Sequence, residues 1–238
     1  HKSTFKDYRI SHDNFHTTHS EENRELSESI YNSIDSKGLI EKKLINQLFD
    51  TSREMFLSDR YVKGQCPECG AIDQYGDNCE KCRATYNAID LQNPISVLTG
   101  TEPIIKESEH MFFKLSDLKD QIIDWLDRSN IQEPVRNKLN EWLDGELKDW
   151  DISRDAPYFG FKIPGYEDKY FYVWLDALTN YISALEYPNK DSELYQKYWP
   201  GIHVVGKDII RFHAIFWPAF LMAADLDPPK QIVAHGWW

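Results

Sequence analysis

Apolar residues recur every three or four positions in three segments, a spacing that predicts amphipathic helices. These segments lie near residues 20–37, 115–128 and 133–149. In the first of them, Leu26, Ile30 and Ile34 share one face. Residues 18–21 read Thr-His-Ser-Glu, which predicts a capping box before this helix, and Gly38 is placed to end it. The apolar stripes of all three helices predict packing surfaces rather than ligand sites.

The last third of the chain alternates apolar runs with helical segments. Three runs predict buried strands, at Tyr170–Leu175, Ile202–Val205 and Ile232–Ala234. The segments between them predict helices over Asp176–Leu185 and Ile209–Ala224, the second with Pro218 placed to kink it. Apolar strands that alternate with helices are typical of a parallel sheet with crossover helices. The sequence therefore predicts an α/β fold.

Short strands and turns are expected between residues 40 and 114, with a strand at residues 111–113. All four cysteines of the chain fall here, as two Cys-x-x-Cys pairs nine residues apart: Cys66, Cys69, Cys79 and Cys82. Two such turns can aim four thiolates at one tetrahedral Zn²⁺, and they leave no open position for catalysis. Disulfides and four reduced core cysteines are the alternatives. The polar, turn-rich surroundings favour a structural zinc site.

A ligand site is expected where the predicted strands end, because open α/β sheets bind ligands beyond the carboxyl ends of their strands. The residues expected there are Asp176, Ala177, Gly206, Lys207, Asp208, His235 and Gly236, followed by Phe212, His213 and Trp217 on the next helix. Asp208 has two interpretations: it caps that helix, or it recognises a ribose or an ammonium group. His213 is either a core residue or part of the site.

Composition narrows the class of protein. The 238 residues are 41% hydrophobic and 14% aromatic, enough for a sizeable core, and the net charge is −12. This charge excludes a protein that works mainly by broad electrostatic attraction to nucleic acid. The sequence shows no long apolar run and no signal peptide, so no membrane partner is expected. His16 and His19 are interpreted as a helix-entry pair, with metal binding as the alternative.

Arg154 lies between two acids in the segment Trp150-Asp-Ile-Ser-Arg-Asp-Ala-Pro157. One interpretation is a surface network of ion pairs. The other is a guanidinium group held by its neighbours and directed at a phosphate or a carboxylate. The spacing alone does not decide between them.

Six segments together resemble the methionyl-tRNA synthetase family. They are CPECG (66–70), DQYGDNCEKC (73–82), SEHMFF (108–113), WDISRDAPYFG (150–160), YVWLDA (172–177) and VGKDIIRFH (205–213). The resemblance runs from Asp13 to Gly236. It implies a class I, Rossmann-like catalytic domain, incomplete here, interrupted by an inserted α+β zinc-knuckle domain. Residues 1–36 would end the first Rossmann half, 37–171 would be the connective-peptide insertion, and 172–238 would begin the second half.

Three features of the family are not found in this sequence: the HIGH motif, the KMSKS motif and the anticodon-binding domain. The resemblance therefore predicts a fragment that is inactive in isolation. Residues 16–19, His-Thr-Thr-His, are not the HIGH motif, because they lack its glycine. Leu178 stands where some members have proline.

The activity implied by the resemblance is that of a cytoplasmic ligase of protein biosynthesis. It would form methionyl-adenylate from methionine and ATP with Mg²⁺, and then charge tRNA(Met). Arg154 would act on the ATP phosphates or on the carboxylate of the amino acid, and Gly206 and Asp208 would contact the ATP ribose. The methionine pocket would be lined by Trp174, Ala177, Tyr181, Phe212 and His213, with Trp150 and Trp217 adjusting around it. Tyr181 would offer its hydroxyl to the sulfur, and one Zn²⁺ would be structural.

Two alternatives stay open. A class I synthetase for leucine, isoleucine or valine would share the Rossmann halves, although an insertion of about 135 residues with a zinc knuckle fits methionine better. A non-catalytic zinc-ribbon module that binds RNA or protein is the other alternative. The charge of −12 and the lack of a basic stripe with interleaved aromatics weigh against it.

Overall fold

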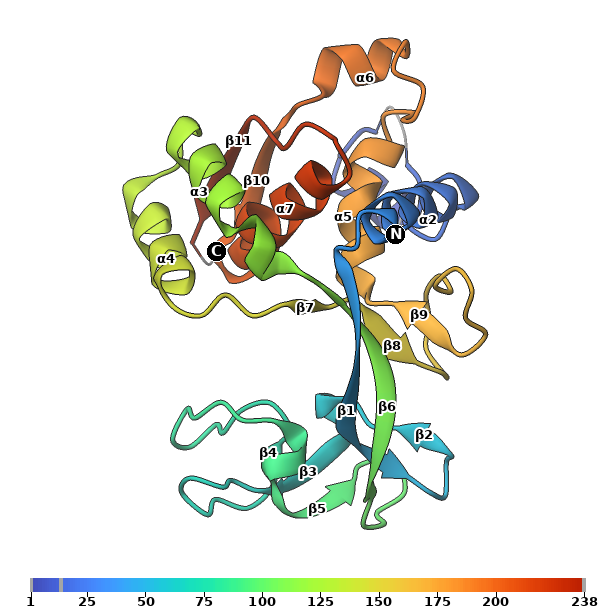
Figure 1. Ribbon diagram of the computed structural model, residues 1–238, viewed down its shortest axis with the longest axis vertical. Helices are drawn as coiled ribbons and strands as arrows, with labels where there is room; N and C mark the ends of the chain where they lie inside the picture. Colours follow the sequence, from blue (N-terminus) through green and yellow to red (C-terminus); the bar gives the residue numbers. More distant parts are fainter. Residues whose placement is uncertain (1, 13–14, 237–238) are drawn as a thin grey trace. The chain divides into compact units, whose positions relative to one another are not determined.

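The computed structural model describes residues 2–12 and 15–236, so Asp13 and Asn14, where the family resemblance begins, lie outside the described residues. The chain has a mixed α/β structure, as predicted (Figure 1). It divides into two compact units that are each built from separate stretches of the sequence. The first unit comprises residues 1–39, 114–148 and 172–238, and the second comprises 40–113 and 149–171.

The first unit is mainly helical. Its α-helices are α1 (Lys2–Asp7), α2 (Glu21–Ser36), α3 (Lys119–Arg128), α4 (Glu133–Asp144), α5 (Val173–Ser183), α6 (Glu193–Tyr198) and α7 (Trp217–Ala223). Short 3₁₀ turns cover Leu115–Leu118 and Lys207–Ile209, and a π-helical turn covers Phe212–Phe216. The strands β10 (Ile202–Gly206) and β11 (Gln231–His235) pair in parallel, which confirms the two predicted strands and their direction.

Helix α2 ends as the sequence predicts but begins later than expected. The N-cap is Ser20, whose hydroxyl accepts the backbone N–H of Asn23, so the capping box predicted from Thr18 is wrong. At the other end Gly38 has φ +71°, and the N–H of Leu39 reaches the carbonyl of Ile34. This is the left-handed helix ending that glycine favours.

The predicted strand at residues 170–175 is wrong. Strand β9 ends at Phe171 and pairs antiparallel in the second unit, and helix α5 already begins at Val173. Leu175, Leu178 and Ile182 are buried with the spacing of one helix face. A short apolar run does not by itself distinguish a strand from a buried helix. Asp176 and Ala177 consequently lie in a helix rather than beyond the end of a strand.

The helix predicted over residues 209–224 is present but irregular. The π-helical turn precedes α7, and Pro218 lies in the first turn of α7. Proline has no N–H to donate to the preceding turn, and a wider π turn is one way in which a helix accommodates such an interruption. The segment is largely buried, and Trp217 is fully so.

Polar contacts tie the helices of the first unit together. The side-chain amide of Asn23 on α2 donates to the carbonyl of Asp176 on α5 at 2.9 Å, and Ser183 donates back to Asn23 at 2.9 Å. The indole N–H of Trp125 on α3 donates to the carbonyl of Pro229. Helices α3 and α4, which confirm two predicted helices, thus pack within the first unit. The assignment of residues 37–171 to an insertion stays a prediction, because an inserted segment can pack on its host.

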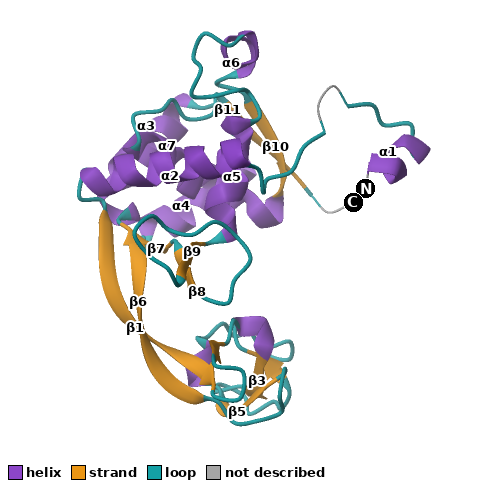
Figure 2. Cartoon of the chain, turned by 90° about the vertical axis from the view of Figure 1, so that its right-hand side faces the viewer, coloured by secondary structure: helices purple, strands orange, loops and turns teal. Residues whose placement is uncertain are grey.

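The second unit is built on strands. They are β1 (Ile40–Asp50), β2 (Met55–Phe56), β3 (Val62–Gln65), β4 (Gln74–Tyr75), β5 (Gln92–Ser96), β6 (Ile104–Phe113), β7 (Trp150–Asp151), β8 (Ser153–Asp155) and β9. The 3₁₀ turns are Asp59–Tyr61 and Ala88–Asp90. Strands β1 and β6 are longer than predicted and form an antiparallel ribbon, and β3 and β5 lie near one end of it (Figure 2).

The sheets of the second unit have the orders β2-β1-β6-β7, β4-β3-β5 and β8-β9. A small core of Leu48, Leu57, Val62 and Leu91 joins β1 to the three-stranded sheet. Gly76 directly follows β4 and needs to be glycine, because a Cβ there would lie 2.8 Å from Cγ1 of Val62.

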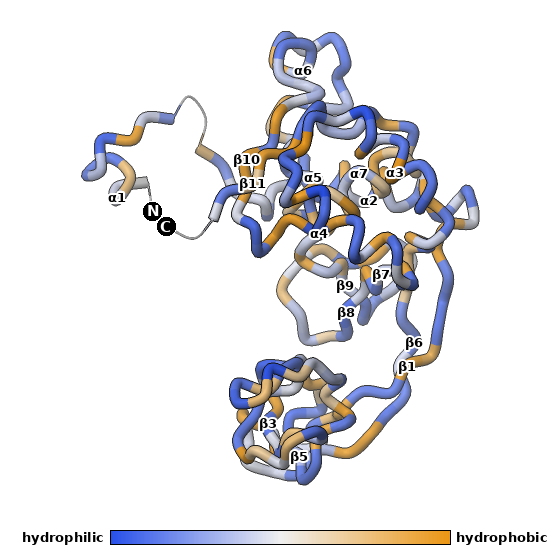
Figure 3. Tube along the Cα trace, turned by 90° about the vertical axis from the view of Figure 1, so that its left-hand side faces the viewer, coloured by the Kyte–Doolittle hydropathy of each residue, from blue (hydrophilic) through white to orange (hydrophobic). Residues whose placement is uncertain are grey.

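Apolar residues form short stretches along the trace (Figure 3). In β10 the exposure of the side chains alternates along the strand: Ile202 and Val204 are 56% and 67% exposed, whereas His203 and Val205 are buried. No helix in the described part of the chain is long and apolar enough to cross a lipid bilayer.

Candidate functional site

The four cysteines of the second unit converge on one point. Their Sγ atoms all lie within 4.8 Å of one another. The Cys66–Cys82 and Cys69–Cys79 sulfur pairs are both 3.7 Å apart, too far for a disulfide. Tetrahedral zinc with bonds of about 2.3 Å requires sulfur atoms about 3.8 Å apart. The arrangement therefore fits a four-thiolate Zn²⁺ site.

The two cysteine turns have the same backbone geometry. The N–H of Cys66 donates to the carbonyl of Ala71, and the N–H of Cys79 donates to that of Ala84. The residue after each second cysteine, Gly70 or Arg83, has φ of +69° or +63°. The backbone N–H of Cys82 points at Sγ of Cys79 and lowers the pKa of that thiol, which favours the thiolate form that binds metal.

A tyrosine braces the second cysteine turn. The hydroxyl of Tyr86 lies 2.9 Å from the carbonyl oxygen of Tyr75 and 2.8 Å from that of Asn78. Tyr86 also packs against the small core of the second unit. The turn is thus fixed by a side chain and by its own backbone, as expected for a structural metal site.

The first unit gathers four of the residues assigned to the methionine pocket. Trp174 on α5 stacks on Phe212 in the π-helical turn, with ring centroids 4.1 Å apart and 11° between the planes. His213 meets the edges of Trp174 and Tyr181, at centroid distances of 6.1 and 5.7 Å. Ala177 lies one helical turn after Trp174 and is half-buried. We call the group of Trp174, Tyr181, Phe212 and His213 the aromatic box.

Hydrogen bonds fix the polar atoms of the aromatic box. Nδ1 of His213 lies 3.0 Å from the carbonyl oxygen of Ile209, an acceptor, so Nδ1 carries the proton. Nε2 is then an acceptor and receives the hydroxyl proton of Tyr181 at 3.0 Å. Burial lowers the pKa of His213 and raises that of Tyr181, so both are neutral near pH 7.

His203 on β10 borders the aromatic box and was not identified from the sequence. Its ring centroid is 4.1 Å from that of Tyr181 and 6.0 Å from that of His213. It is 6% exposed, and burial lowers its pKa to about 4. No sequence pattern marks it, because its neighbours Ile202 and Val204 are apolar and yet exposed, whereas the histidine faces inward.

Three buried polar atoms in this region have no hydrogen-bond partner among the described residues. They are Nε2 of His203, Nε1 of Trp217 and Oδ1 of Asp176. Trp199 lies between the first two, with its ring 5.9 Å from His203 and 6.4 Å from Trp217. Burial raises the pKa of Asp176 to about 6. Unpaired buried polar atoms are uncommon and call for a functional or structural explanation.

Gly206 and Asp208 lie at the carboxyl end of β10. Gly206 is in register with His235 of β11, and the 3₁₀ turn that contains Asp208 follows it. A Cβ on Gly206 would lie 2.5 Å from Oδ1 of Asp208, so the carboxylate folds back over the glycine. The side chain of Asp208 does not cap a helix, which weakens the N-cap interpretation of this residue.

Trp150 and Arg154 belong to the second unit. Trp150 is buried on β7, and Arg154 lies on β8 opposite Tyr170 of β9. The guanidinium group of Arg154 donates to the carbonyl of Ser153 and lies 3.4 Å from Oδ2 of Asp151. Arg154 is therefore held by its neighbours, which fits both interpretations of this segment. The roles of Trp150 and Arg154 toward a ligand stay predictions.

A buried network of charges lies beside Arg154. Asp155 accepts hydrogen bonds from the ammonium group of Lys169 and from the hydroxyl of Ser108. His110 lies between Asp155 and Asp151. Burial works to raise the pKa of Asp155, but the hydrogen bonds from His110, Lys169 and Ser108 outweigh it and hold this pKa well below its ordinary value. Asp155 is thus a carboxylate at any physiological pH.

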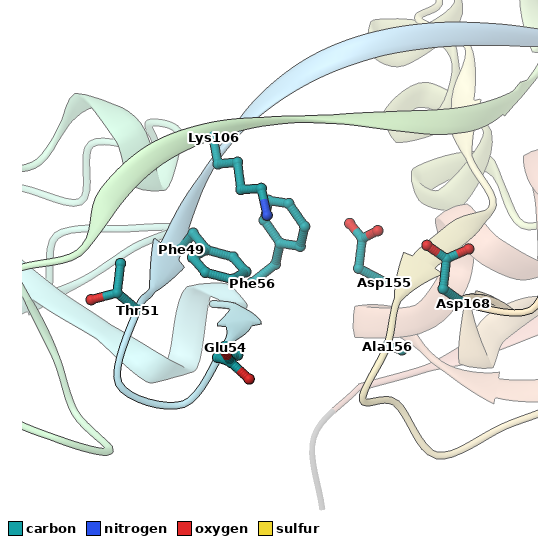
Figure 4. A pocket seen from close by; sticks show the side chains of 8 residues that line it. All are labelled: Phe49, Thr51, Glu54, Phe56, Lys106, Asp155, Ala156 and Asp168. Carbon is teal, nitrogen blue, oxygen red and sulfur yellow. The ribbon is translucent and has the colours of Figure 1, made fainter.

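A cavity of about 530 Å³ adjoins this network (Figure 4). It is lined by Phe49, Thr51, Glu54, Phe56, Lys106, Asp155, Ala156 and Asp168. Nζ of Lys106 lies 4.3 Å from the ring centroid of Phe49, opposite the two aspartates. Its walls thus carry both charge signs beside two aromatic rings. None of the residues predicted from the sequence lines it.

Comparison with known proteins places the chain in a family. Residues 1–238 match the family of tRNA synthetases class I (M). The structure is similar to that of Mycobacterium tuberculosis methionyl-tRNA synthetase bound by methionyl-adenylate, with TM-score 0.71 and 31% identity over 99% of this chain and 42% of that chain. The apo form of that enzyme gives TM-score 0.69 and 31% identity, over 99% and 43%. This chain thus spans less than half the length of these solved structures. Because the family match covers the whole sequence, the chain belongs to the class I (M) tRNA synthetases.

Proposed function

We propose that the complete gene product activates methionine with ATP and transfers it to tRNA(Met). The observation that carries this proposal is the aromatic box, which joins a flat stacked pair of rings to a neutral histidine–tyrosine hydrogen bond. Aromatic rings suit a polarizable thioether sulfur. The 31% identity to methionyl-tRNA synthetases of known structure supports the same assignment.

Selection of methionine over leucine or isoleucine needs more than shape. Differences of one methylene discriminate by only ~1–3 kcal/mol. The hydroxyl proton of Tyr181 is donated to His213, so a bound sulfur, which can only accept a hydrogen bond, would compete with His213 for this proton. The polar contact made in this way adds to the fit of the pocket. Ala177 leaves room beside Trp174 for an unbranched chain, and Trp217 and Trp150 would adjust around it.

The adenosine of ATP would be bound at the end of β10. Gly206 would let the backbone approach the ribose closely, and Asp208 would accept its hydroxyl protons. The overlap between a Cβ on Gly206 and Oδ1 of Asp208 supports a shared role for the two residues. The substrate would be ATP with Mg²⁺, which offsets charge on the phosphates.

Arg154 would stabilise negative charge on the ATP phosphates or on the methionine carboxylate. In the reaction, a carboxylate oxygen of methionine attacks the α-phosphorus atom and pyrophosphate leaves. The contribution of the protein is positioning and electrostatic stabilisation. Arg154 is a cation held from one side by Asp151 and by the carbonyl of Ser153, which leaves its orientation defined.

The Zn²⁺ would be held by Cys66, Cys69, Cys79 and Cys82 and would be structural. Four thiolates complete the tetrahedral coordination of the ion, so it would stabilise the folded state and would not act as a Lewis acid on a substrate. Its role would be to fix the turns at the end of the β1–β6 ribbon.

Aminoacylation of transcripts tests the proposed function. The complete gene product should charge a tRNA(Met) transcript with methionine and leave a tRNA(Leu) transcript uncharged. Charging with leucine, isoleucine or valine would keep the class I family but overturn the pocket assignment. A folded, zinc-loaded complete product that charges no tRNA would favour the zinc module that binds RNA or protein.

A further inference from the structure

His110 on β6 is buried between two carboxylates. Its Nδ1 lies 2.8 Å from Oδ2 of Asp151, its Nε2 lies 2.9 Å from Oδ2 of Asp155, and the residue is 1% exposed. A carboxylate has no proton to donate, so each ring nitrogen makes a hydrogen bond there only if it carries a proton. This geometry describes an imidazolium ion.

The two acids that His110 joins flank Arg154 in the sequence. Asp151 lies three residues before it on β7, and Asp155 directly follows it on β8. Ile152 separates β7 from β8, and its N–H donates to the carbonyl of Met111 at 3.0 Å. Because β7 pairs with β6 and β8 pairs with β9, the histidine ring bridges two separate sheets on either side of this residue.

Asp151 is shared between His110 and Arg154. The same oxygen, Oδ2, lies 2.8 Å from His110 and 3.4 Å from Arg154. The other oxygen accepts the N–H of Ser153 at 3.1 Å and its hydroxyl at 3.2 Å. A charged His110 therefore takes the shorter contact with Asp151 and leaves Arg154 the longer one.

We infer that His110 is a positioning residue for Arg154: its imidazolium takes the shorter contact with Asp151, leaves the guanidinium group the longer one, and fixes the segment that carries Arg154. This inference rests on the proposed role of Arg154 toward ATP or methionine. Without the charge of His110, Asp151 would pair more closely with Arg154 than the present 3.4 Å and draw it away from its ligand.

Other charged groups around His110 are consistent with this state. Lys169 of β9 pairs with Asp155, so two cations and two carboxylates balance in the buried network. On β1, Lys43 pairs with Asp149 and with Glu41. Burial works to lower the pKa of His110, but the hydrogen bonds that it donates to Asp151 and Asp155 outweigh it and raise this pKa.

Gln47 of β1 could instead stabilise a neutral His110 ring, which is the alternative protonation state. Its amide nitrogen lies 2.8 Å from Nε2 of His110 and 3.0 Å from Oδ2 of Asp155. A neutral ring could accept the amide proton, but its lone pair would then face a carboxylate oxygen 2.9 Å away. The two states are distinguished by the proton on Nε2.

Nuclear magnetic resonance of the ¹⁵N-labelled histidines in this chain tests the protonation directly. We expect both ring nitrogens of His110 to carry protons at pH 7.5. A neutral His110 ring at pH 7.5 would overturn the inference, whatever the activity of any variant.

Kinetics of the complete gene product test the positioning role. His110→Gln, which keeps hydrogen bonding but removes the charge, should lower the kcat of methionine-dependent ATP–pyrophosphate exchange by about tenfold or more. The KM for methionine should stay within about threefold, since the aromatic box is unchanged. His16→Gln, which alters an exposed histidine paired with Glu22, is the matched control and should behave as wild type.

A double-mutant cycle separates this role from general damage. If His110 acts through Arg154, then His110→Gln should add little to Arg154→Ala. Asp151→Asn, which weakens the competing pair, should restore part of the activity lost in His110→Gln. Full additivity, no rescue, or wild-type exchange by His110→Gln would each contradict the inference. Absence of any methionine-dependent exchange by the wild type would instead contradict the proposed function.

Discussion

The hydroxyl of Tyr181 donates to Nε2 of His213 across 3.0 Å, because Nδ1 of His213 is committed to the carbonyl of Ile209. The only neutral polar pair of the aromatic box is thus satisfied internally before any ligand arrives. A thioether is only a weak acceptor, so it can share this proton with His213 without displacing the histidine nitrogen. We therefore expect the pocket to bind methionine, and to bind more weakly any amino acid whose side chain breaks the hydrogen bond between Tyr181 and His213.

Tyr181→Phe removes the hydroxyl and leaves His213 with an unsatisfied nitrogen. The unsatisfied nitrogen lowers stability in the free and bound enzyme alike, whereas the lost hydroxyl contact to the sulfur, about 0.5–1.5 kcal/mol, weakens binding alone; the KM for methionine should rise by up to about tenfold while kcat changes little. Discrimination against leucine should fall in parallel. Steady-state exchange kinetics with both amino acids measure this, with Tyr198→Phe on the exposed part of α6 as the control. Unchanged discrimination would show that the hydroxyl does not contribute to selection.

The buried His203 makes the first unit sensitive to acid. Its folded pKa, about 4, lies below its ordinary value of 6.5, so the unfolded chain binds the proton more readily. Stability is therefore complete above pH 6.5 and is lost as pH falls from 6.5 toward 4, by up to about 3 kcal/mol. His213, whose pKa is also lowered, acts in the same direction.

His203→Phe should make the free energy of unfolding depend less on pH, and the stability that remains pH-dependent should still fall as the pH falls. The free energy of unfolding, measured by denaturant at pH 7.5 and at pH 5, gives the comparison. Wild type should lose more stability between these two values than the variant does. Equal losses in the two proteins would show that His203 is not a neutral buried residue.

Cys79→Ser replaces a thiolate ligand with a hydroxyl, which is a poor zinc ligand. Zinc content should fall well below one per chain, and the midpoint of thermal unfolding should drop, because metal binding contributes to folding of the cysteine turns. Lys81→Ser, an exposed change within the same turn, should keep both zinc and stability. Metal analysis and calorimetry of the two variants decide the matter. Full zinc content in Cys79→Ser would exclude the four-sulfur site.

Gly206→Ala places a methyl group 2.5 Å from the position of Oδ1 of Asp208, so the carboxylate must move. If Asp208 binds the ATP ribose, the KM for ATP should rise by about tenfold, equivalent to the loss of one charge-assisted hydrogen bond. The KM for methionine should not change. Gly145→Ala, where the added methyl finds only ordinary contacts of 3.7 and 3.9 Å, is the control. An unaltered KM for ATP would contradict the ribose assignment.

What could be predicted from the sequence was mainly local. The cysteine spacing indicated the zinc site because each Cys-x-x-Cys turn is complete within six residues, and the sulfur positions confirm the cluster. The helix ending at Gly38 was predictable for the same reason, since one left-handed glycine decides it.

What could not be predicted depends on contacts between distant segments. The run at residues 170–175 was misassigned because its apolar character fits a strand and a buried helix equally well. The network around His110 joins it to Asp151 and Asp155, which lie 41 and 45 positions further along the chain, and no pattern in the sequence marks it. His203 lay within a correctly predicted strand, but only the exposure of Ile202 and Val204 shows that it faces inward.

Methionine-dependent ATP–pyrophosphate exchange by the complete gene product is the measurement that tests the proposed function. Methionine, leucine, isoleucine and valine are compared at equal concentration, with Arg154→Ala run beside the wild type. The proposed function predicts exchange with methionine alone, reduced by about tenfold or more in the variant because a charge-stabilising group is lost. Exchange that prefers another amino acid, or that no amino acid stimulates, would contradict it.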